Sequence, residues 1–288
     1  MTRCGTETSM PIHDAGYRPY RGGRSAPGRS WLVITTTGVR ATVGKRLFLG
    51  LLLVAWAPFL VRAVQIYASV NFPQASFLDV SARTFHDFLE QQSLFVFIIT
   101  VWVGAGLIAN DLRSNALQIY LSKPLTRAEY VAGKFGILFL LLLLVTWVPA
   151  MLLLAAQVLL TGSFAFLAAN LHLIPAVTVV SLVLVLLSAF TILALSSFST
   201  SARFVAVTYA GVYFFTEALF AVVRGATVRT TFSWLSVSAS VNQINDAVFR
   251  LPLRFETPLA VSLAAPAVLI GLSVLVLRRR VRAVEVVG

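Results

Sequence analysis

Charged residues are scarce in this 288-residue chain, and cysteine is almost absent. Asp, Glu, Lys and Arg together make up 12% of the residues, whereas about 25% is usual for a soluble domain. The single cysteine, Cys4, excludes a disulfide bond within the chain. The low charge excludes an ordinary soluble domain. The remaining composition, 58% hydrophobic with a mean hydropathy of +0.86, indicates a membrane protein.

Sequence patterns of catalytic sites are also missing. The chain has no HExxH zinc pattern and no GxSxG serine elbow. Its nearest approach to a phosphate-binding loop runs from Gly38 to Gly44-Lys45-Arg46. That stretch has one residue too many between the glycines, and arginine stands where the metal-binding hydroxyl is required. We therefore expect no enzyme activity, no metal and no cofactor in this chain.

Six apolar runs approach the length of about 20 residues that a helix needs to cross a membrane. They are Leu47–Ala68, Ser93–Ala109, Phe135–Leu160, Leu171–Ser196, Phe204–Val223 and Leu259–Leu277. Residues 1–28 are rich in Gly, Pro, Ser and Arg and show no apolar period. We predict a disordered cytoplasmic tail over 1–28 and an all-α polytopic membrane domain over 29–288.

Lysine and arginine are distributed unevenly around these spans. Seventeen lie on the side that carries both termini, and five lie on the other side. Cytoplasmic loops carry the excess of basic residues in membrane proteins. The sequence thus predicts that both termini are in the cytoplasm. We expect the chain to lie in the inner membrane of a bacterium. The same distribution accounts for the net charge of +12 without a nucleic-acid partner.

Three segments outside the spans carry helical patterns. Residues 30–46 mix apolar and basic side chains, which is typical of a helix in the cytoplasmic interface. Residues 69–92 combine acidic residues with phenylalanines and predict a short helix over the outer mouth. Residues 224–258 predict an amphipathic helix at the outer interface or against other spans. Its apolar seam is Trp234, Val237, Val241, Ile244, Val248 and Leu251, and Asn242, Asn245, Asp246 and Arg250 lie off the seam.

Two ionisable residues, Arg62 and Glu217, fall inside the predicted spans. Charges at such depth are candidates for function because burying them without a partner costs several kcal/mol. Arg62 lies near the end of its span and can instead extend its charge to the outer interface. Glu217 is equally consistent with a translocation pathway and with a structural pair. The two residues can also pair with each other.

The stretch Asn110–Lys134 separates the second and third spans. Leu112, Ala116, Ile119 and Tyr120 fall on one helical face. A break follows at Ser122-Lys123-Pro124, because proline disfavours helical geometry in the residue before it. Thr126-Arg127-Ala128-Glu129 has the pattern of a capping box, which predicts a new helix that starts near Arg127 and continues into the third span.

This stretch resembles the loop after the second span of ABC-2 type transporter permeases. The resemblance runs through DLRSNALQIYLSKPLTRAEY, residues 111–130, and closes with Gly133-Lys134. Members of that family often carry an acidic residue, an Arg-Ser-Gly-like step, a Leu-rich helix, Ser-(Arg/Lys)-Pro, Thr-Arg, an acidic residue, a tyrosine and Gly-Lys. Asn115 stands here where glycine is frequent. The six spans, the basic interfacial segment and the amphipathic outer helix are similar to the same family in layout.

The resemblance implies the membrane-spanning subunit of an exporter. Such permeases form homodimers that bind two copies of a separate ATPase subunit, and ATP-Mg binds there rather than in this chain. The loop would then be the coupling helix that contacts the ATPase. The residues assigned to this contact are Asp111, Leu112, Arg113, Leu117, Tyr120, Leu121, Lys123, Pro124, Arg127 and Glu129. The alternative is a secondary transporter driven by an ion gradient, with Glu217 as the proton-binding group.

Overall fold

The computed structural model describes residues 30–72, 79–116, 126–163 and 165–280. Within these ranges every regular element is a helix, which confirms the all-α prediction. In chain order they are α1 (Ser30–Val43), α2 (Arg46–Ala55), α3 (Ala57–Asn71), α4 (Ala82–Ile99), η2 (Thr100–Gly104), α5 (Gly106–Arg113), α7 (Arg127–Val145), α8 (Trp147–Thr161), α9 (Ala165–Ala169), α10 (Leu173–Ser196), α11 (Ala202–Thr227), η3 (Ser233–Leu235), α12 (Val237–Val248) and α13 (Leu259–Arg280). The tail predicted over 1–28 lies outside the described residues.

Six helical segments are long and apolar enough to cross a membrane, as predicted. They are Arg46–Asn71, Ala82–Arg113, Arg127–Thr161, Leu173–Ser196, Ala202–Thr227 and Leu259–Arg280. The first and third consist of two helices each, with breaks at Trp56 and Thr146. Each break is followed within three residues by a proline, Pro58 or Pro149. Proline has no backbone N–H for the preceding turn, so the helix is interrupted there.

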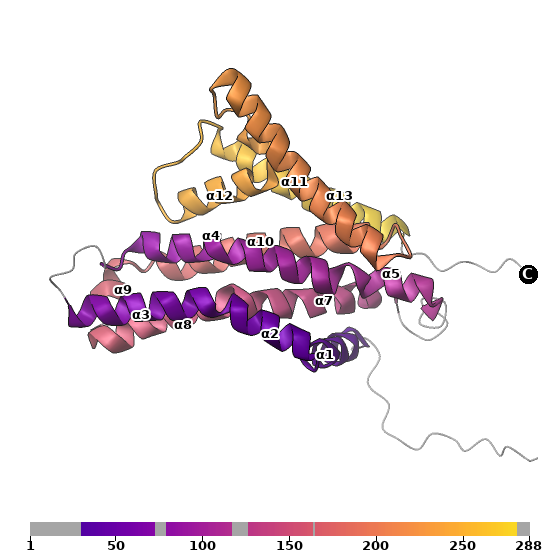
Figure 1. The fold of residues 1–288 in the computed structure, drawn as a ribbon, viewed down its shortest axis with the longest axis horizontal. Coiled ribbons are helices and arrows are strands. Elements are labelled where there is room, and N and C mark those ends of the chain that lie inside the picture. Colours follow the sequence, from indigo (N-terminus) through magenta and orange to yellow (C-terminus); the bar gives the residue numbers. More distant parts are fainter. Residues whose placement is uncertain (1–29, 73–78, 117–125, 164, 281–288) are drawn as a thin grey trace, which may run out of the picture.

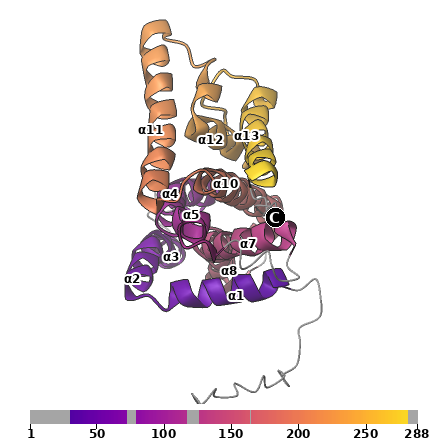
Figure 2. The same cartoon turned by 90° about the vertical axis from the view of Figure 1, so that its right-hand side faces the viewer.

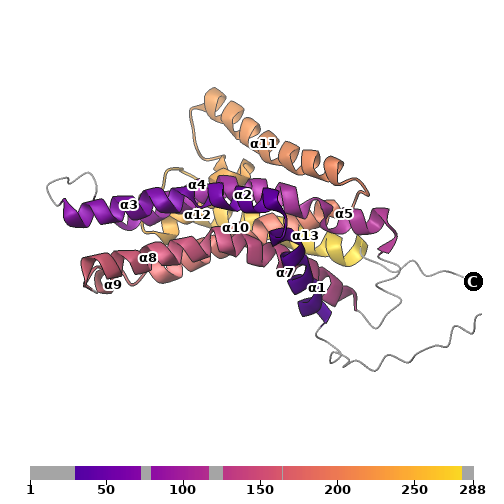
Figure 3. The same cartoon turned by 60° about the horizontal axis from the view of Figure 1, so that its bottom comes forward.

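Helix α10 lies at the centre of the bundle. It packs against α4, α7, α8, α11, α12 and α13. Helices α3, α4, α8 and α10 run side by side along the long axis of the molecule (Figure 1). Helix α11 diverges from this bundle, and α12 and α13 lie on the same side of it (Figures 2 and 3). In the most apolar stretch of α11, 17% of residues are buried, against 56% in α10. Most of α11 is therefore free to contact lipid or another protein.

Helix α1 crosses one end of the bundle and packs against the start of α7 (Figure 2). The contact is close because α7 offers glycines there. A Cβ atom added at Gly133 would lie 2.7 Å from Ile34 Cβ, and one at Gly136 would lie 2.5 Å from Thr35 Oγ1. The Thr35 hydroxyl lies 3.1 Å from the Gly133 carbonyl oxygen and is buried. The predicted N-terminal helix is thus confirmed as a helix, and its position at a membrane surface stays a prediction.

The second span contains one turn of π-helix, η2, between α4 and α5. Such turns leave backbone groups without their usual helical partners. The buried Ser196 of α10 meets these groups: its hydroxyl accepts from the backbone N–H of Ile108 (3.2 Å) and Ala109 (2.9 Å) and lies 2.9 Å from the Ala105 carbonyl oxygen. One side chain of the central helix therefore supplies hydrogen-bond partners for the backbone groups at this irregular turn.

Two predictions for the outer segments are wrong in part. Residues 82–92 form the first turns of the second span rather than a separate short helix, and a capping box at Ser81 and Thr84 starts that helix. In α12, Asn245 and Asp246 are buried, although the apolar seam placed them on the opposite face. Trp234, which was assigned to the seam, is 44% exposed. The cause is that α12 packs against other helices on its polar face as well, where α4 supplies polar partners.

Candidate functional site

The loop between the second and third spans is described on both of its flanks. Helix α5 ends at Arg113, the Ser114 hydroxyl donates to the Asn110 carbonyl oxygen (2.9 Å), and Asn115 adopts a left-handed backbone with φ of 52°. The continuous helix predicted from Leu112 through Tyr120 is therefore wrong at 114–115, because that conformation ends a helix. The predicted contact residues Leu117, Tyr120, Leu121, Lys123 and Pro124 lie outside the described residues.

The start of α7 matches the prediction. The Glu129 backbone N–H donates to the Thr126 hydroxyl (3.2 Å), and the Thr126 backbone N–H donates to Glu129 Oε2 (2.9 Å). These reciprocal bonds are the predicted capping box, and α7 begins at Arg127. The helix then continues without a break as far as Val145. The capped end is thus part of the third span itself.

Asp111 joins the two flanks of the loop. Its Oδ2 atom lies 2.7 Å from Lys134 Nζ and accepts a hydrogen bond of 2.7 Å from the Tyr130 hydroxyl. The Lys134 ammonium also lies 5.5 Å from the centroid of the Tyr130 ring, within cation–π range. We call Asp111, Tyr130 and Lys134 the loop clamp. Asp111 is one of the predicted contact residues, whereas no role was predicted for Tyr130 and Lys134, because a motif alone does not show which residues meet.

The other predicted contact residues that are described lie around the clamp. Leu112 is half-buried, and Arg113 and Arg127 are exposed on the two sides of the loop. The clamp is shielded by comparison, since the side chains of Lys134 and Asp111 are 13% and 16% exposed. The loop flanks therefore combine a shielded ionic link with an exposed basic rim.

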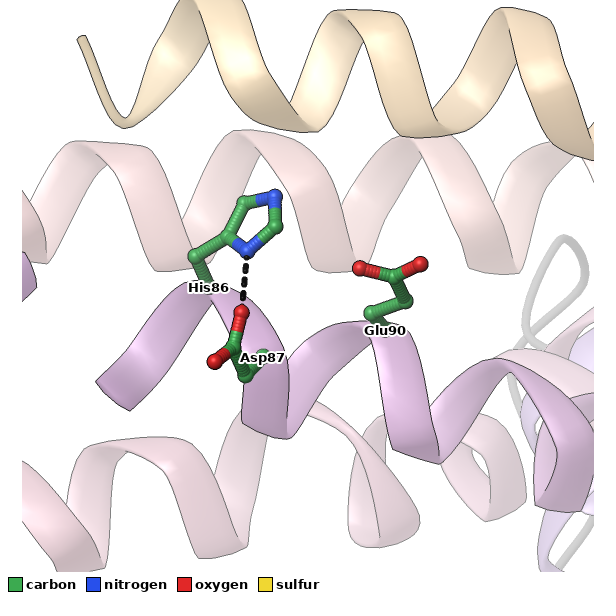
Figure 4. A group of neighbouring side chains, drawn as sticks. All are labelled: His86, Asp87 and Glu90. Atoms are coloured by element: carbon green, nitrogen blue, oxygen red, sulfur yellow. Dashed lines mark hydrogen bonds and ion pairs between the residues drawn. The ribbon is translucent and has the colours of Figure 1, made fainter. Parts of the chain in front are cut away.

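A second polar cluster lies at the start of α4, where His86, Asp87 and Glu90 share one stretch of helix (Figure 4). The two ring nitrogens of His86 each lie 2.8 Å from a carboxylate oxygen, Nδ1 from Asp87 Oδ1 and Nε2 from Asp246 Oδ1. Arg254 donates to both oxygens of Glu90 (2.9 and 3.0 Å) and to both oxygens of Asp246 (2.9 Å each). These five residues link α4 to α12 and to the segment before α13.

His86, Asp87 and Glu90 also have the spacing of a metal site, with ligand atoms within 4.8 Å of one another. The geometry fits an ionic cluster better. Both oxygens of Glu90 already accept hydrogen bonds from Arg254, so the guanidinium occupies the position of a bound cation. The hydrogen bonds to Glu90 and Asp246 raise the pKa of Arg254 above its ordinary value, which keeps the charge in place.

The two predicted intramembrane charges do not form a pair. The Arg62 guanidinium donates to Gln65 Oε1 one turn away (2.9 Å). The Glu217 carboxylate accepts hydrogen bonds from the hydroxyls of Ser236 and Ser238, both on the α12 side. No ion pair joins Arg62 to Glu217 in the part of the chain that the structure describes. The possible pairing fails because α3 and α11 lie on different sides of the bundle (Figure 2).

Two cavities adjoin each other along α12, an inner one between α4, α10, α11 and α12 and an outer one between α11, α12 and Phe255. A narrow inner part of about 60 Å³ has Ser188, Thr191, Tyr209 and Tyr213 in its wall. A wider outer part of about 580 Å³ includes Glu217. The two parts share Ser238 and Asn242. The sequence indicated Glu217 by its depth, and Tyr213 precedes it by four residues on the same helix, but the hydroxyl groups of Ser236 and Ser238 come from a separate segment that no local pattern connects to it.

Six apolar helices, with polar side chains gathered into clusters between them, define a multi-pass membrane protein. A scan against models of known protein families matches none of them, and a search of curated proteins finds no match either. Any narrower class for this chain therefore rests on the loop sequence and on the geometry around it.

Proposed function

We propose that this chain is the permease subunit of an ATP-binding-cassette exporter of the ABC-2 type. It would act as a homodimer with two copies of a separate ATPase subunit, in a bacterial inner membrane and with both termini in the cytoplasm. The loop sequence from Asp111 to Lys134, the six apolar helices and the capped start of α7 support the proposal. The exposed length of α11 offers a surface for the second copy.

The loop clamp is the observation that carries the proposal. A loop that receives force from another protein needs both of its ends fixed to the helices it moves. Asp111 is at the end of the second span, and Tyr130 and Lys134 are in the first two turns of the third. A push on the loop would therefore displace α5 and α7 together. Helix α7 would pass that motion to α10, against which it packs.

Co-purification with an ATPase tests the proposal directly. The chain would be expressed with the ATPase encoded next to its gene, and the two proteins should elute as one complex that hydrolyses ATP. Leu117→Asp with Tyr120→Asp should abolish this association, because charge replaces the apolar contact expected from the resemblance. Leu253→Asp is the matched control, since Leu253 is exposed and lies on the other side of the predicted membrane. Failure of any ATPase to associate would contradict the proposal, and undiminished association of the double variant would contradict the role of the loop.

A secondary transporter driven by protons is the alternative, and Glu217 is the observation that favours it. Its carboxylate lies within a span at the edge of a cavity and receives hydroxyl hydrogen bonds without a basic partner in the described residues. Proton-coupled transporters place such groups inside their spans. Transport into vesicles that is driven by a pH gradient, needs no ATPase and is lost in Glu217→Gln would support this alternative over the exporter.

A further inference from the structure

We propose that the cavity beside Glu217 binds a monovalent organic cation with an apolar or aromatic body. The inference rests on the proposed function, because it names the substrate class of the exporter. It draws on three observations: a carboxylate without a cationic partner, aromatic rings on both sides of that carboxylate, and two adjoining cavities that have these groups in their walls and share Ser238 and Asn242.

Two carboxylates inside the described helices, Glu129 and Glu217, have no ion pair with a basic residue, and Glu129 instead forms the capping box at the start of α7. Asp87, Glu90, Asp111 and Asp246 each lie beside an arginine, a lysine or a histidine. No ion pair joins Glu217 to any basic residue that the structure describes, although it lies just past the middle of the spanning helix α11. A carboxylate at this depth is costly unless a positive charge compensates it. The compensating charge would then come from a ligand.

Hydrogen bonds leave part of the carboxylate free for that ligand. Ser236 and Ser238 both donate to Oε1. The other oxygen, Oε2, accepts no hydrogen bond from the described residues. The two hydroxyls fix the orientation of the carboxylate without neutralising it. Glu217 is therefore positioned as a charged acceptor at the wall of the outer part of the cavity.

Aromatic rings flank Glu217 on the same helix. Tyr213 precedes it by four residues and Phe220 follows it by three, so all three lie on one face of α11. Tyr213 lines the inner part of the cavity and Phe220 the outer part. Phe97 of α4 packs on the Tyr213 ring, with centroids 4.9 Å apart. Rings beside a carboxylate attract organic cations through their negative faces and also bind apolar groups.

Arg224 is the basic residue that also lines the outer part of the cavity. It is exposed, and it lies seven residues beyond Glu217, which is about 10 Å along the helix. Arg224 forms no ion pair with Glu217 in the part of the chain that the structure describes. The inner part of the cavity has hydroxyl, phenol and apolar groups in its wall, with no basic side chain among the described residues. The inner part therefore carries no charge of its own, and Glu217 is the carboxylate next to it in the outer part.

Calorimetric titration of the purified full chain in nanodiscs tests the inference, with empty nanodiscs as the blank. The probe is benzyltrimethylammonium, and phenylmethanesulfonate, which carries the opposite charge on a similar body, is the control ligand. The cation should bind and the anion should not. Glu217→Gln keeps the size of the side chain and should weaken cation binding at least about tenfold. Glu256→Gln makes the same change at an exposed site and should leave binding unchanged.

Tyr213→Leu is the second variant, for use if Glu217→Gln does not fold. It keeps an apolar side chain and removes the ring, so cation binding should weaken about three- to tenfold. Equal binding of cation and anion, no binding by the wild type, or unchanged affinity in Glu217→Gln or Tyr213→Leu would each overturn the inference. The titration needs no ATPase, so its failure would leave the exporter proposal standing. Conversely, failure of an ATPase to co-purify would leave a measured cation site intact.

Discussion

The ion pair between Asp111 and Lys134 ties the second span to the third, and Lys134→Met is the sharpest test of that tie. Methionine keeps a long unbranched side chain, so the change removes mainly the charge. Pairs in full contact with water contribute about 0–1 kcal/mol, whereas removing one partner of a fully buried pair costs about 3–5 kcal/mol. The Asp111–Lys134 pair is 2.7 Å long, and its side chains are 16% and 13% exposed. Because Asp111 keeps its hydrogen bond from Tyr130, we expect a cost of about 1–3 kcal/mol.

Thermal unfolding of the purified chain, followed by tryptophan fluorescence, measures this cost. A loss of that size should lower Tm by about 2–4 °C for each kcal/mol. Arg127→Met is the matched control, since Arg127 is exposed on the same helix and forms no ion pair with any described residue. Asp111→Asn completes a double-mutant cycle, in which the double variant should lose less than the two single variants together. Equal Tm values for Lys134→Met and the wild type, or strictly additive losses, would refute the clamp.

Two further variants test the polar links of the fold. Ser196→Ala should cost about 1–3 kcal/mol because it removes the side chain that satisfies the π-turn, and Thr200→Ala, which is exposed, should change Tm little. Arg254→Gln should lower Tm more than the exposed control Arg229→Gln, since it leaves the buried Asp246 with His86 and the backbone N–H of residue 254 but without the guanidinium charge. The raised pKa of Arg254 means that its stabilising charge is present below the ordinary pKa of arginine and is lost above the raised value. The difference in Tm between wild type and Arg254→Gln should therefore stay constant from about pH 7 to 10, and a fall in this range would contradict the ionic cluster.

Features that depend on neighbouring residues could be predicted from the sequence. The six spans follow from apolar runs whose length alone sets whether a helix can cross a membrane. The start of α7 follows from Thr126 and Glu129, which bond to each other across three residues. The ends of the spans were accordingly predicted to within about one turn, and the start of α7 to the residue. The exceptions are the starts of the second and third spans, where polar residues extend the helix beyond the apolar run.

Features that depend on distant residues could not be predicted. His86 and Asp246 are 160 residues apart, and each is polar. Read singly, each indicates a surface position, so the sequence assigned the first turns of α4 to a short helix outside the spans and Asp246 to the polar face of α12. Only their contact makes burial favourable, because each satisfies the charge or hydrogen bond of the other. The same holds for Ser196. Nothing near it in the sequence shows that its hydroxyl forms hydrogen bonds with the backbone beside the π-turn of another helix.

The packing of α1 against α7 also determines the order in which the helices can assemble during synthesis. Thr35 contacts the Gly133 carbonyl oxygen, which is 98 residues later in the chain. A ribosome adds about 5–20 residues each second, so roughly 5–20 s separate the emergence of the two partners. The first and second spans are made during that interval, and α1 has no glycine surface to pack on until it ends. The N-terminal helix therefore waits outside the bundle and docks after the third span emerges.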